Sequence, residues 1–214
     1  MVLEKFKEQF LQPLSEVDRL LAIAVPSHAH ATFLKNKIPN NTVFLGHFFD
    51  ENQNSHWLEF LREEGFFRYP PREGRWPQAG YLARMARIDD ATAERICAVI
   101  CELGDVDNRL TRAELLEGIG AMPPRIGAKL VDKIEPWARE VMGFPVEEFG
   151  TLIGQFAMGG EPEAAFRIAR ALLDVRPAWT GSRARHGHCP FSPALQLLKG
   201  RVAALSWRDY GSLK

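Results

Sequence analysis

Two stretches of this sequence repeat one another at a distance of 34 residues. Residues 82–103 read LARMARIDDATAERICAVICEL, and residues 116–137 read LEGIGAMPPRIGAKLVDKIEPW. Aligned without a gap, they match apolar or small residues in pairs: Leu82 with Leu116, Met85 with Ile119, Ala86 with Gly120, Ile88 with Met122, Ala93 with Gly127, Ile96 with Leu130, Ile100 with Ile134 and Leu103 with Trp137. The spacing is that of one face of a helix, interrupted by Asp89-Asp90 or Pro123-Pro124. Each copy is therefore predicted to be helix, short turn, helix.

A third, looser copy begins near Leu152 or Ile153, at an offset of 36 to 38 residues. One amphipathic hairpin cannot bury both of its apolar faces, so neighbouring hairpins are expected to stack into a continuous core. Small residues at Ala86, Gly120 and Ala157 would let paired helices approach closely. The residues predicted to be buried together are Leu82, Met85, Ile96, Leu116, Ile119, Leu130, Ile134 and Phe156. The repeat predicts an all-α chain of stacked antiparallel helical hairpins, an α-solenoid; the alternative is a helical bundle without a repeat.

The predicted organisation has three parts: a helical, capping region over residues 1–75, a helical-repeat region over 76–175 and an irregular basic tail over 176–214. Within the first part, residues 28–37 favour a short helix. Residues 42–50 fit a helix or a strand and are assigned to a helix, because everything nearby is helical. Ser55 is a candidate N-cap of the next helix, and Gly65 is a candidate stop.

Composition places the chain among ordinary globular proteins. It has 214 residues, 46% apolar and 25% charged, with a net charge of zero. No apolar run approaches the roughly 20 residues of a membrane span, and the first residues lack a secretory signal pattern. Three cysteines are few for a disulfide framework and favour a reducing, cytoplasmic setting. The tail carries seven cations against Asp209 alone, which suits an anion partner or simply a solvated end.

One string of residues carries a resemblance: Trp57-Leu58, Gly65-Phe66-Phe67, Pro70-Pro71, Trp76-Pro77, Tyr81-Leu82 and Met122-Pro123-Pro124. It resembles the N-terminal helical region of large, uncharacterised bacterial proteins, over about residues 42–175. The period of the repeat is that of tetratricopeptide repeats, but their Trp-x-x-Leu-Gly-x-x-Tyr pattern is absent, so the looser HEAT-like class is a better fit. The resemblance implies a helical-repeat fold, a bacterial source and no catalytic residues. Those proteins are longer, so it also implies a shortened member or a fragment.

Chemistry-bearing residue types form no complete site in the sequence. His186, His188 and Cys189 are the only compact group of metal-ligand types, and they lack the further ligands that zinc needs. Cys97 and Cys101 lie one helical turn apart, where burial as small apolar side chains explains them. No nucleophile–base motif or phosphate-binding loop is present. We therefore expect no cofactor, no bound metal, no small-molecule substrate and no catalytic activity.

Two sets of residues are candidates for binding a macromolecule. The first is the aromatic connector, residues 66–76, whose candidate partner anchors are Phe66, Phe67, Tyr69 and Trp76; the alternative is that they plug one end of the repeats. The second is a basic stripe on successive second helices, formed by Arg95, Lys129 and Arg167. Such a stripe binds nucleic-acid backbones through phosphates, although Glu94, Asp132 and Glu163 dilute it. The sequence thus predicts a protein-interaction scaffold, with a HEAT-like nucleic-acid-binding protein of the DNA-repair type as the alternative.

Overall fold

The computed structural model describes residues 4–5, 7–40, 43–140 and 146–173. Every regular element in these ranges is helical and none is a strand, which confirms the all-α class for them. In chain order the elements are η1 (Lys7–Leu11, a π-helix), α2 (Gln12–Leu21), α3 (His28–Lys37), α4 (Phe44–Glu51), α5 (Trp57–Glu63), α6 (Pro77–Met85), α7 (Asp90–Glu102), α8 (Arg109–Ala121), α9 (Pro124–Gly127), η2 (Ala128–Leu130, a 3₁₀-helix), α10 (Val131–Arg139), α11 (Val146–Met158) and α12 (Pro162–Leu173).

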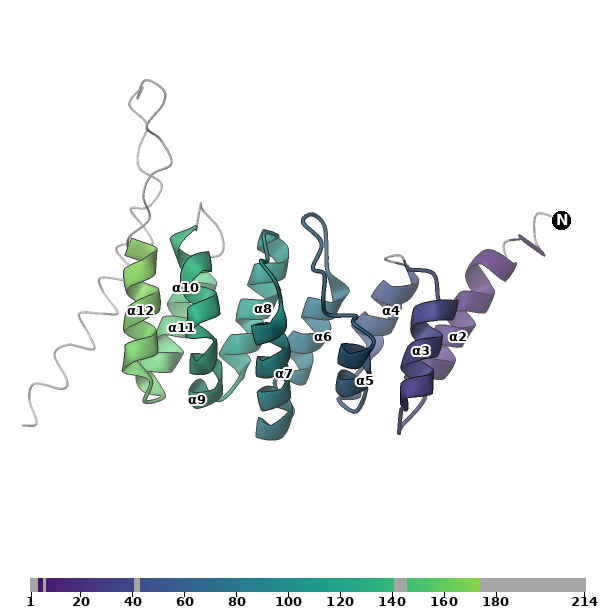
Figure 1. The fold of residues 1–214 in the computed structure, drawn as a ribbon, viewed down its shortest axis with the longest axis horizontal. Coiled ribbons are helices and arrows are strands. Elements are labelled where there is room, and N and C mark those ends of the chain that lie inside the picture. Colours follow the sequence, from purple (N-terminus) through teal and green to yellow (C-terminus); the bar gives the residue numbers. More distant parts are fainter. Residues whose placement is uncertain (1–3, 6, 41–42, 141–145, 174–214) are drawn as a thin grey trace, which may run out of the picture.

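The helices lie side by side in two rows along the long axis of the molecule (Figure 1). In one row, α2 packs against α4, α4 against α6, α6 against α8, and α8 against α11. In the other row, α3 packs against α5, α7 against α9 and η2, and α10 against α12. Contacts between the rows join helices that follow each other in the chain, such as α2 with α3, α6 with α7, and α11 with α12. The chain therefore advances in successive helix pairs.

One cluster of buried apolar side chains runs along the two rows, from Val17 in α2 to Ala171 in α12. It contains every residue that the repeat predicted to be buried together: Leu82, Met85, Ile96, Leu116, Ile119, Leu130, Ile134 and Phe156. The predicted boundary at residue 75 does not divide the cluster, because α4, which precedes it, packs against α6, which follows it. The helices before residue 75 thus continue the same rows.

The closest approach between α6 and α8 depends on Gly118. A Cβ atom at this position would lie 2.8 Å from the Cα of Ala83, a backbone atom that has little room to move. At Gly120, which the sequence singled out, the nearest atom is Oε1 of the flexible Gln155 side chain, at 2.9 Å. Gly118 is therefore the small residue that sets the distance between these helices.

Short polar residues and prolines set where the helices begin. Asp89 accepts a hydrogen bond from the backbone N–H of Thr92 at 2.7 Å, and this bond holds the pKa of Asp89 below its usual value. Asn108 caps α8 by accepting hydrogen bonds from the N–H groups of Leu110 and Thr111. The helices α6, α9 and α12 begin at Pro77, Pro124 and Pro162. Proline is favoured at the first helical position because the backbone N–H that it lacks would have no partner within the helix.

Two sequence assignments before residue 65 have different outcomes. The segment that fitted a helix or a strand forms α4, so its helical assignment is confirmed. The assignment of Ser55 as an N-cap is wrong: α5 begins at Trp57, and Oδ1 of Asn54 accepts the hydrogen bond of the His56 N–H. Because this hydrogen bond makes an Asx turn from Asn54 to His56, Ser55 lies inside the turn and not at the start of the helix.

Several predictions concern residues outside the described ranges. The tail over residues 176–214 lies there, with His186, His188 and Cys189. Within the described ranges, no helix has both the length and the apolar content that crossing a membrane requires.

Candidate functional site

A groove of about 400 Å³ opens where the aromatic connector meets the ends of four helices. We call it the connector groove. It lies at the C-terminal ends of α3 and α5 and the N-terminal ends of α4 and α6. Its lining residues are Lys35, Asn40, Leu45, Gly46, Glu64, Gly65, Phe66, Tyr69, Pro71, Arg75, Trp76, Pro77 and Gln78. Three of the four aromatic residues that the sequence proposed as anchors are among them.

The local sequence explains why the connector leaves α5 where it does. Gly65 has a φ of +82°, a left-handed conformation that favours glycine, and it ends the helix as the sequence predicted. The Phe66 N–H donates to the carbonyl of Leu61, and the Gly65 N–H donates to the carbonyl of Arg62. These two bonds close the last turn and direct the chain into the connector.

The aromatic residues of the connector divide into buried and exposed ones. Phe67 and Trp76 are only 3% and 4% exposed, and Phe66 is partly buried against the core. Tyr69 is 86% exposed. The four residues therefore do not form one exposed set of anchors, and for Phe67 and Trp76 that prediction has to be corrected. Tyr69 is the aromatic side chain in the connector that a partner can reach fully.

Packing around Phe49 is the physical reason for the burial of the phenylalanines. The ring of Phe67 stacks on Tyr81, with centroids 6.4 Å apart and planes 6° apart. Both Phe66 and Phe67 also contact the ring of Phe49, at centroid distances of 5.8 and 6.3 Å. These rings bury a large apolar area, so they belong to the core that holds the connector in place.

The connector lies inside the rows and does not plug an end of them. The α4 helix contacts α6 directly, and α2 packs against α4 on its far side. Asn108, at the start of α8, also holds the connector in place. Its Nδ2 donates to the carbonyls of Pro71, at 3.1 Å, and Gly74, at 2.6 Å. The same side chain caps α8, so the position of the connector is tied to the start of that helix.

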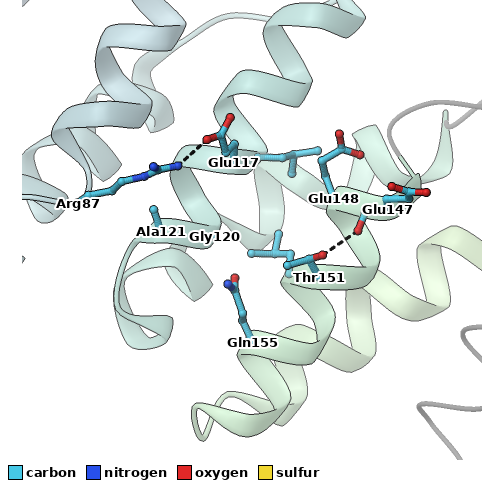
Figure 2. Close-up of a pocket in the computed structure, with 10 residues that line it drawn as sticks. Arg87, Glu117, Gly120, Ala121, Glu147, Glu148, Thr151 and Gln155 are labelled. Atoms are coloured by element: carbon cyan, nitrogen blue, oxygen red, sulfur yellow. Dashed lines mark hydrogen bonds and ion pairs between the residues drawn. The ribbon is translucent and has the colours of Figure 1, made fainter.

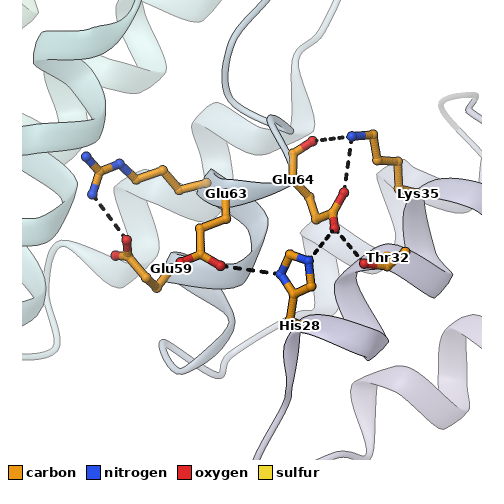
Figure 3. A network of polar contacts seen from close by, with 7 residues as sticks. His28, Thr32, Lys35, Glu59, Glu63 and Glu64 are labelled. Carbon is orange, nitrogen blue, oxygen red and sulfur yellow. Dashed lines mark hydrogen bonds and ion pairs between the residues drawn. The ribbon is translucent and has the colours of Figure 1, made fainter.

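A network of polar contacts borders the groove on the side of α3 and α5 (Figure 3). The Glu64 carboxylate accepts hydrogen bonds from Thr32 and Lys35 and lies 3.1 Å from Nε2 of His28. The hydrogen bond from Thr32 is the main reason that the pKa of Glu64 lies below its usual value. Lys35 also donates to the backbone carbonyl of Glu64, at 2.7 Å. The only carboxylate in the lining is therefore already bound by its neighbours.

Arg75 lies on the other side of the groove. Its two terminal nitrogens donate to the two carboxylate oxygens of Asp50, each at 2.7 Å, and this pairing raises the pKa of Arg75. Its Nε lies 3.8 Å from Oε1 of Glu114. Nothing in the sequence near Lys35 or Arg75 marked them as site residues, because only the fold brings α3 and the connector together.

The residues of the predicted basic stripe lie on α7, η2 and α12, and they are Arg95, Lys129 and Arg167. Lys129 Nζ is 2.7 Å from both carboxylate oxygens of Glu94. Arg167 binds Asp132 at 2.7 Å and also Glu135, whose hydrogen bond raises the pKa of Arg167. Arg95 donates to the Thr92 hydroxyl. A phosphate would have to compete with carboxylates for two of these three cations, so the stripe is not a continuous basic surface.

Comparisons of the chain with protein-family models, with curated proteins and with solved structures find no match.

A second cleft, of about 440 Å³, lies between α8 and α11 (Figure 2). Its charged lining residues are Arg87, Glu117, Glu147 and Glu148. Arg87 forms an ion pair with Glu117. Glu147 and Glu148 stand in the first turn of α11, where the positive end of the helix dipole favours carboxylates. The favourable interaction of the two carboxylates with the helix N-terminus is sufficient to explain their presence at this position.

Metal-ligand residue types do not gather in the described part of the chain, where no group of three or more could hold an ion. Cys97 is buried, and its burial raises the pKa of the thiol to about 11. Its Sγ faces the carbonyl of Ile126 at 3.7 Å. The thiol is therefore protonated at neutral pH and packs as a small apolar side chain, while Cys101 is exposed.

Proposed function

We propose that this protein is a HEAT-like α-solenoid that acts as a protein-interaction module without catalytic activity of its own. The observation that carries the proposal is Tyr69, a large aromatic side chain that is almost fully exposed beside a groove. Tyrosine is enriched among the residues that dominate the binding energy of protein interfaces.

The connector suits binding because it is held in place before a partner arrives. Phe67 stacks on Tyr81, and Asn108 bonds two carbonyls of the connector. A partner that contacts Tyr69 would therefore lose little free energy in ordering the connector.

The solenoid part of the proposal is supported by recurring contacts. Ion pairs join residues 35 positions apart at successive helix pairs: Asp90 with Arg125, Glu94 with Lys129 and Asp132 with Arg167. These three pairs join α7 to α9 and η2, and α10 to α12, at the same separation in sequence, as expected of successive units with similar geometry. Because cysteines are sparse and Cys97 is a free thiol, we place the protein in the cytoplasm.

Affinity capture from an extract of the native cell tests the function. The tagged wild-type chain is compared with Tyr69→Ala and, as a matched control at another exposed apolar residue, Ile88→Ala. We expect a protein partner to be retained by the wild type and the control and lost from Tyr69→Ala, at low and at high salt. Binding of nucleic acid that is lost at high salt and in a Lys129→Gln, Arg167→Gln variant would support the phosphate-binding alternative instead.

A further inference from the structure

We infer that residues 193–208 form a helix that packs on the exposed apolar side of α12 and extends the rows by one further helix. The α12 helix contributes no residue to the lining of the connector groove, so this surface is separate from the proposed partner site and goes beyond the proposed function. Three observations support the inference: the apolar residues of α12, the pattern of residues 193–208, and the length and charge of the chain that follows α12.

The α12 helix carries apolar side chains on more than one side. The side that faces the core is formed by Ala164, Ala165, Ile168 and Ala171. A second apolar row, spaced by three and four residues, contains Phe166, Ala169 and Leu173. Phe166 and Leu173 are 66% and 64% exposed. A helix that is apolar on several sides is typical of a buried position, so α12 is expected to have a further neighbour.

The place of α12 in the fold shows which side lacks that neighbour. The helix stands at one end of the two rows and packs mainly against α10 and α11 (Figure 1). Arg167 binds Asp132 and Glu135 of α10, and the helical spacing puts Ala169 and Leu173 on a different side from Arg167. The last helices of a solenoid normally present a polar outer face to water. The exposed row of α12 is apolar, so we expect a further segment to cover it.

The chain after α12 contains a segment with the pattern of an amphipathic helix. Residues 193–208 read PALQLLKGRVAALSWR. Large apolar residues recur in it at intervals of three, four and three, and they are Leu195, Leu198, Val202 and Leu205. Ser192 is a candidate N-cap, and Pro193 suits the first helical position. The segment thus combines the start signal of a helix with one apolar side that needs a partner.

The residues that predict an irregular tail lie before this segment. Between residues 176 and 192 they are Pro177, Gly181, Gly187 and Pro190. Residues 194–208 contain no proline and one glycine, Gly200. The expectation of an irregular tail over residues 176–214 therefore has an exception in residues 193–208.

The length of the linker makes a segment of the same chain the favoured occupant. Residues 174–192 join α12 to the segment, and 19 residues extend to at most roughly 65 Å. The α12 helix has 12 residues and is roughly 18 Å long, so the segment can reach every part of it. A linker that spans its two sites gives an effective concentration on the order of 1 mM. Docking within the chain therefore competes well with the same contact between two chains.

The charges of the two parts of the chain also favour this contact. Residues 175–214 carry six more cations than carboxylates, and residues 1–174 carry six more carboxylates than cations. Beside the exposed row of α12, Glu163 and Arg170 balance each other. The attraction therefore acts between the two parts as a whole, and the apolar rows determine where the segment docks.

Photo-crosslinking of the purified full chain tests the inference. A benzophenone amino acid replaces Phe166, in the exposed row of α12, and in a separate protein it replaces Leu110, which is 54% exposed in α8. After irradiation, mass spectrometry of the monomer identifies the crosslinked peptides. We expect crosslinks within the chain from position 166 to residues 193–208, at a yield about tenfold or more above that from position 110.

Paired substitutions show which side of the segment docks. Leu198→Asp together with Val202→Asp puts two charges into the apolar row and should lower the crosslinking from position 166 about tenfold or more. The matched control is Gln196→Asp together with Ala203→Asp, which adds the same two charges on the opposite side of a helix. The control should leave the crosslinking unchanged.

Amide hydrogen exchange of the full chain tests the helix and its contact with α12. The amides of residues 194–208 should exchange about tenfold or more slowly than those of residues 176–192. Phe166→Asp should remove this protection, and Leu110→Asp should not. Exchange in α7, which neither substitution touches, shows that each variant remains folded.

Several results would overturn the inference. Crosslinks from position 166 that join two chains, and not residues of one chain, would show that a second copy covers α12. Crosslinks that persist after Leu198→Asp with Val202→Asp would show that the apolar row of the segment is not what docks. Absence of crosslinks to residues 193–208, or rapid exchange of their amides, would show that this segment does not cover α12. Capture of a partner through Tyr69 is measured separately, so the proposed function stands or falls independently of these results.

Discussion

Lys129 and Glu94 face each other across two successive helix pairs, with Nζ 2.7 Å from both carboxylate oxygens. The separation of 35 residues between them is also the separation of Arg125 from Asp90. Both pairs join α7 to the segment formed by α9 and η2, which packs against it in the same row. The pairs therefore link neighbouring helix pairs outside the apolar core.

The first prediction concerns the strength of the Lys129–Glu94 pair. Both side chains are well exposed, so we expect the pair to contribute no more than about 1 kcal/mol to the free energy of unfolding. A double-mutant cycle with Lys129→Gln and Glu94→Gln, followed by urea unfolding, measures this coupling. A coupling well above that value would mean that ion pairs, and not the apolar core, hold the units together.

The second prediction concerns Leu130, which the sequence repeat placed in the core. It is buried in the apolar cluster, so Leu130→Ala should lower the free energy of unfolding by about 2–5 kcal/mol. The control is Leu110→Ala, at an exposed position of α8, where a change within about 0.5 kcal/mol is expected. Similar effects of the two substitutions in urea unfolding would contradict the described packing.

The third prediction compares two glycines in helices. Gly118→Ala places a Cβ atom 2.8 Å from the Cα of Ala83 and should cost about 1–3 kcal/mol as α6 and α8 are forced apart. Gly154→Ala, in α11, meets no atom within 4 Å and should stabilise the protein by about 0.5–1 kcal/mol, because alanine favours the helix. The two variants should shift the thermal unfolding midpoint in opposite directions, and shifts of the same sign would refute the close approach at Gly118.

The fourth prediction concerns the pH dependence of stability through Glu114. Burial raises its pKa, and Arg75 at 3.8 Å offsets this only in part. Above the ordinary glutamate pKa, the folded protein therefore holds this proton more tightly than the unfolded chain does. The contribution of Glu114 to stability falls as the pH rises through that window.

Glu114→Gln removes this proton. The free energy of unfolding of Glu114→Gln relative to the wild type should therefore rise as the pH increases above the ordinary glutamate pKa of about 4.3. Carboxylates with lowered pKa, such as Asp89 and Glu135, have the opposite pH dependence, but they are common to both proteins and cancel in the difference. Parallel curves for the two proteins would show that burial of Glu114 does not affect its ionisation.

The core positions between residues 82 and 137 could be predicted from the sequence because their apolar residues recur at helical spacing. Leu116 and Leu130, which align with Leu82 and Ile96, were assigned to the core, and all four are buried. The helices before residue 75 do not share that period, so the sequence did not indicate that α2 to α5 continue the same rows. Their positions depend on contacts between α4 and α6 that no local pattern encodes.

The candidate site was predicted only in part. Tyr69 and Phe67 stand two residues apart in a connector without helical periodicity, so the sequence has no signal that separates the exposed ring from the buried one. Contacts with Phe49 and Tyr81 decide the burial of Phe67. Lys35 was missed for a similar reason: it reaches the groove only because α3 packs against α5.

The central claim is that a protein partner binds at Tyr69, on a connector that the core holds in place. Site-specific photo-crosslinking in the native cell tests it most directly, with a benzophenone amino acid at position 69 and, in a separate variant, at position 88. Ile88 is a suitable control because it is also an exposed apolar residue, outside the lining of the groove. We predict a discrete protein adduct from position 69 that position 88 does not give. No adduct from position 69, or the same adducts from both positions, would contradict the claim.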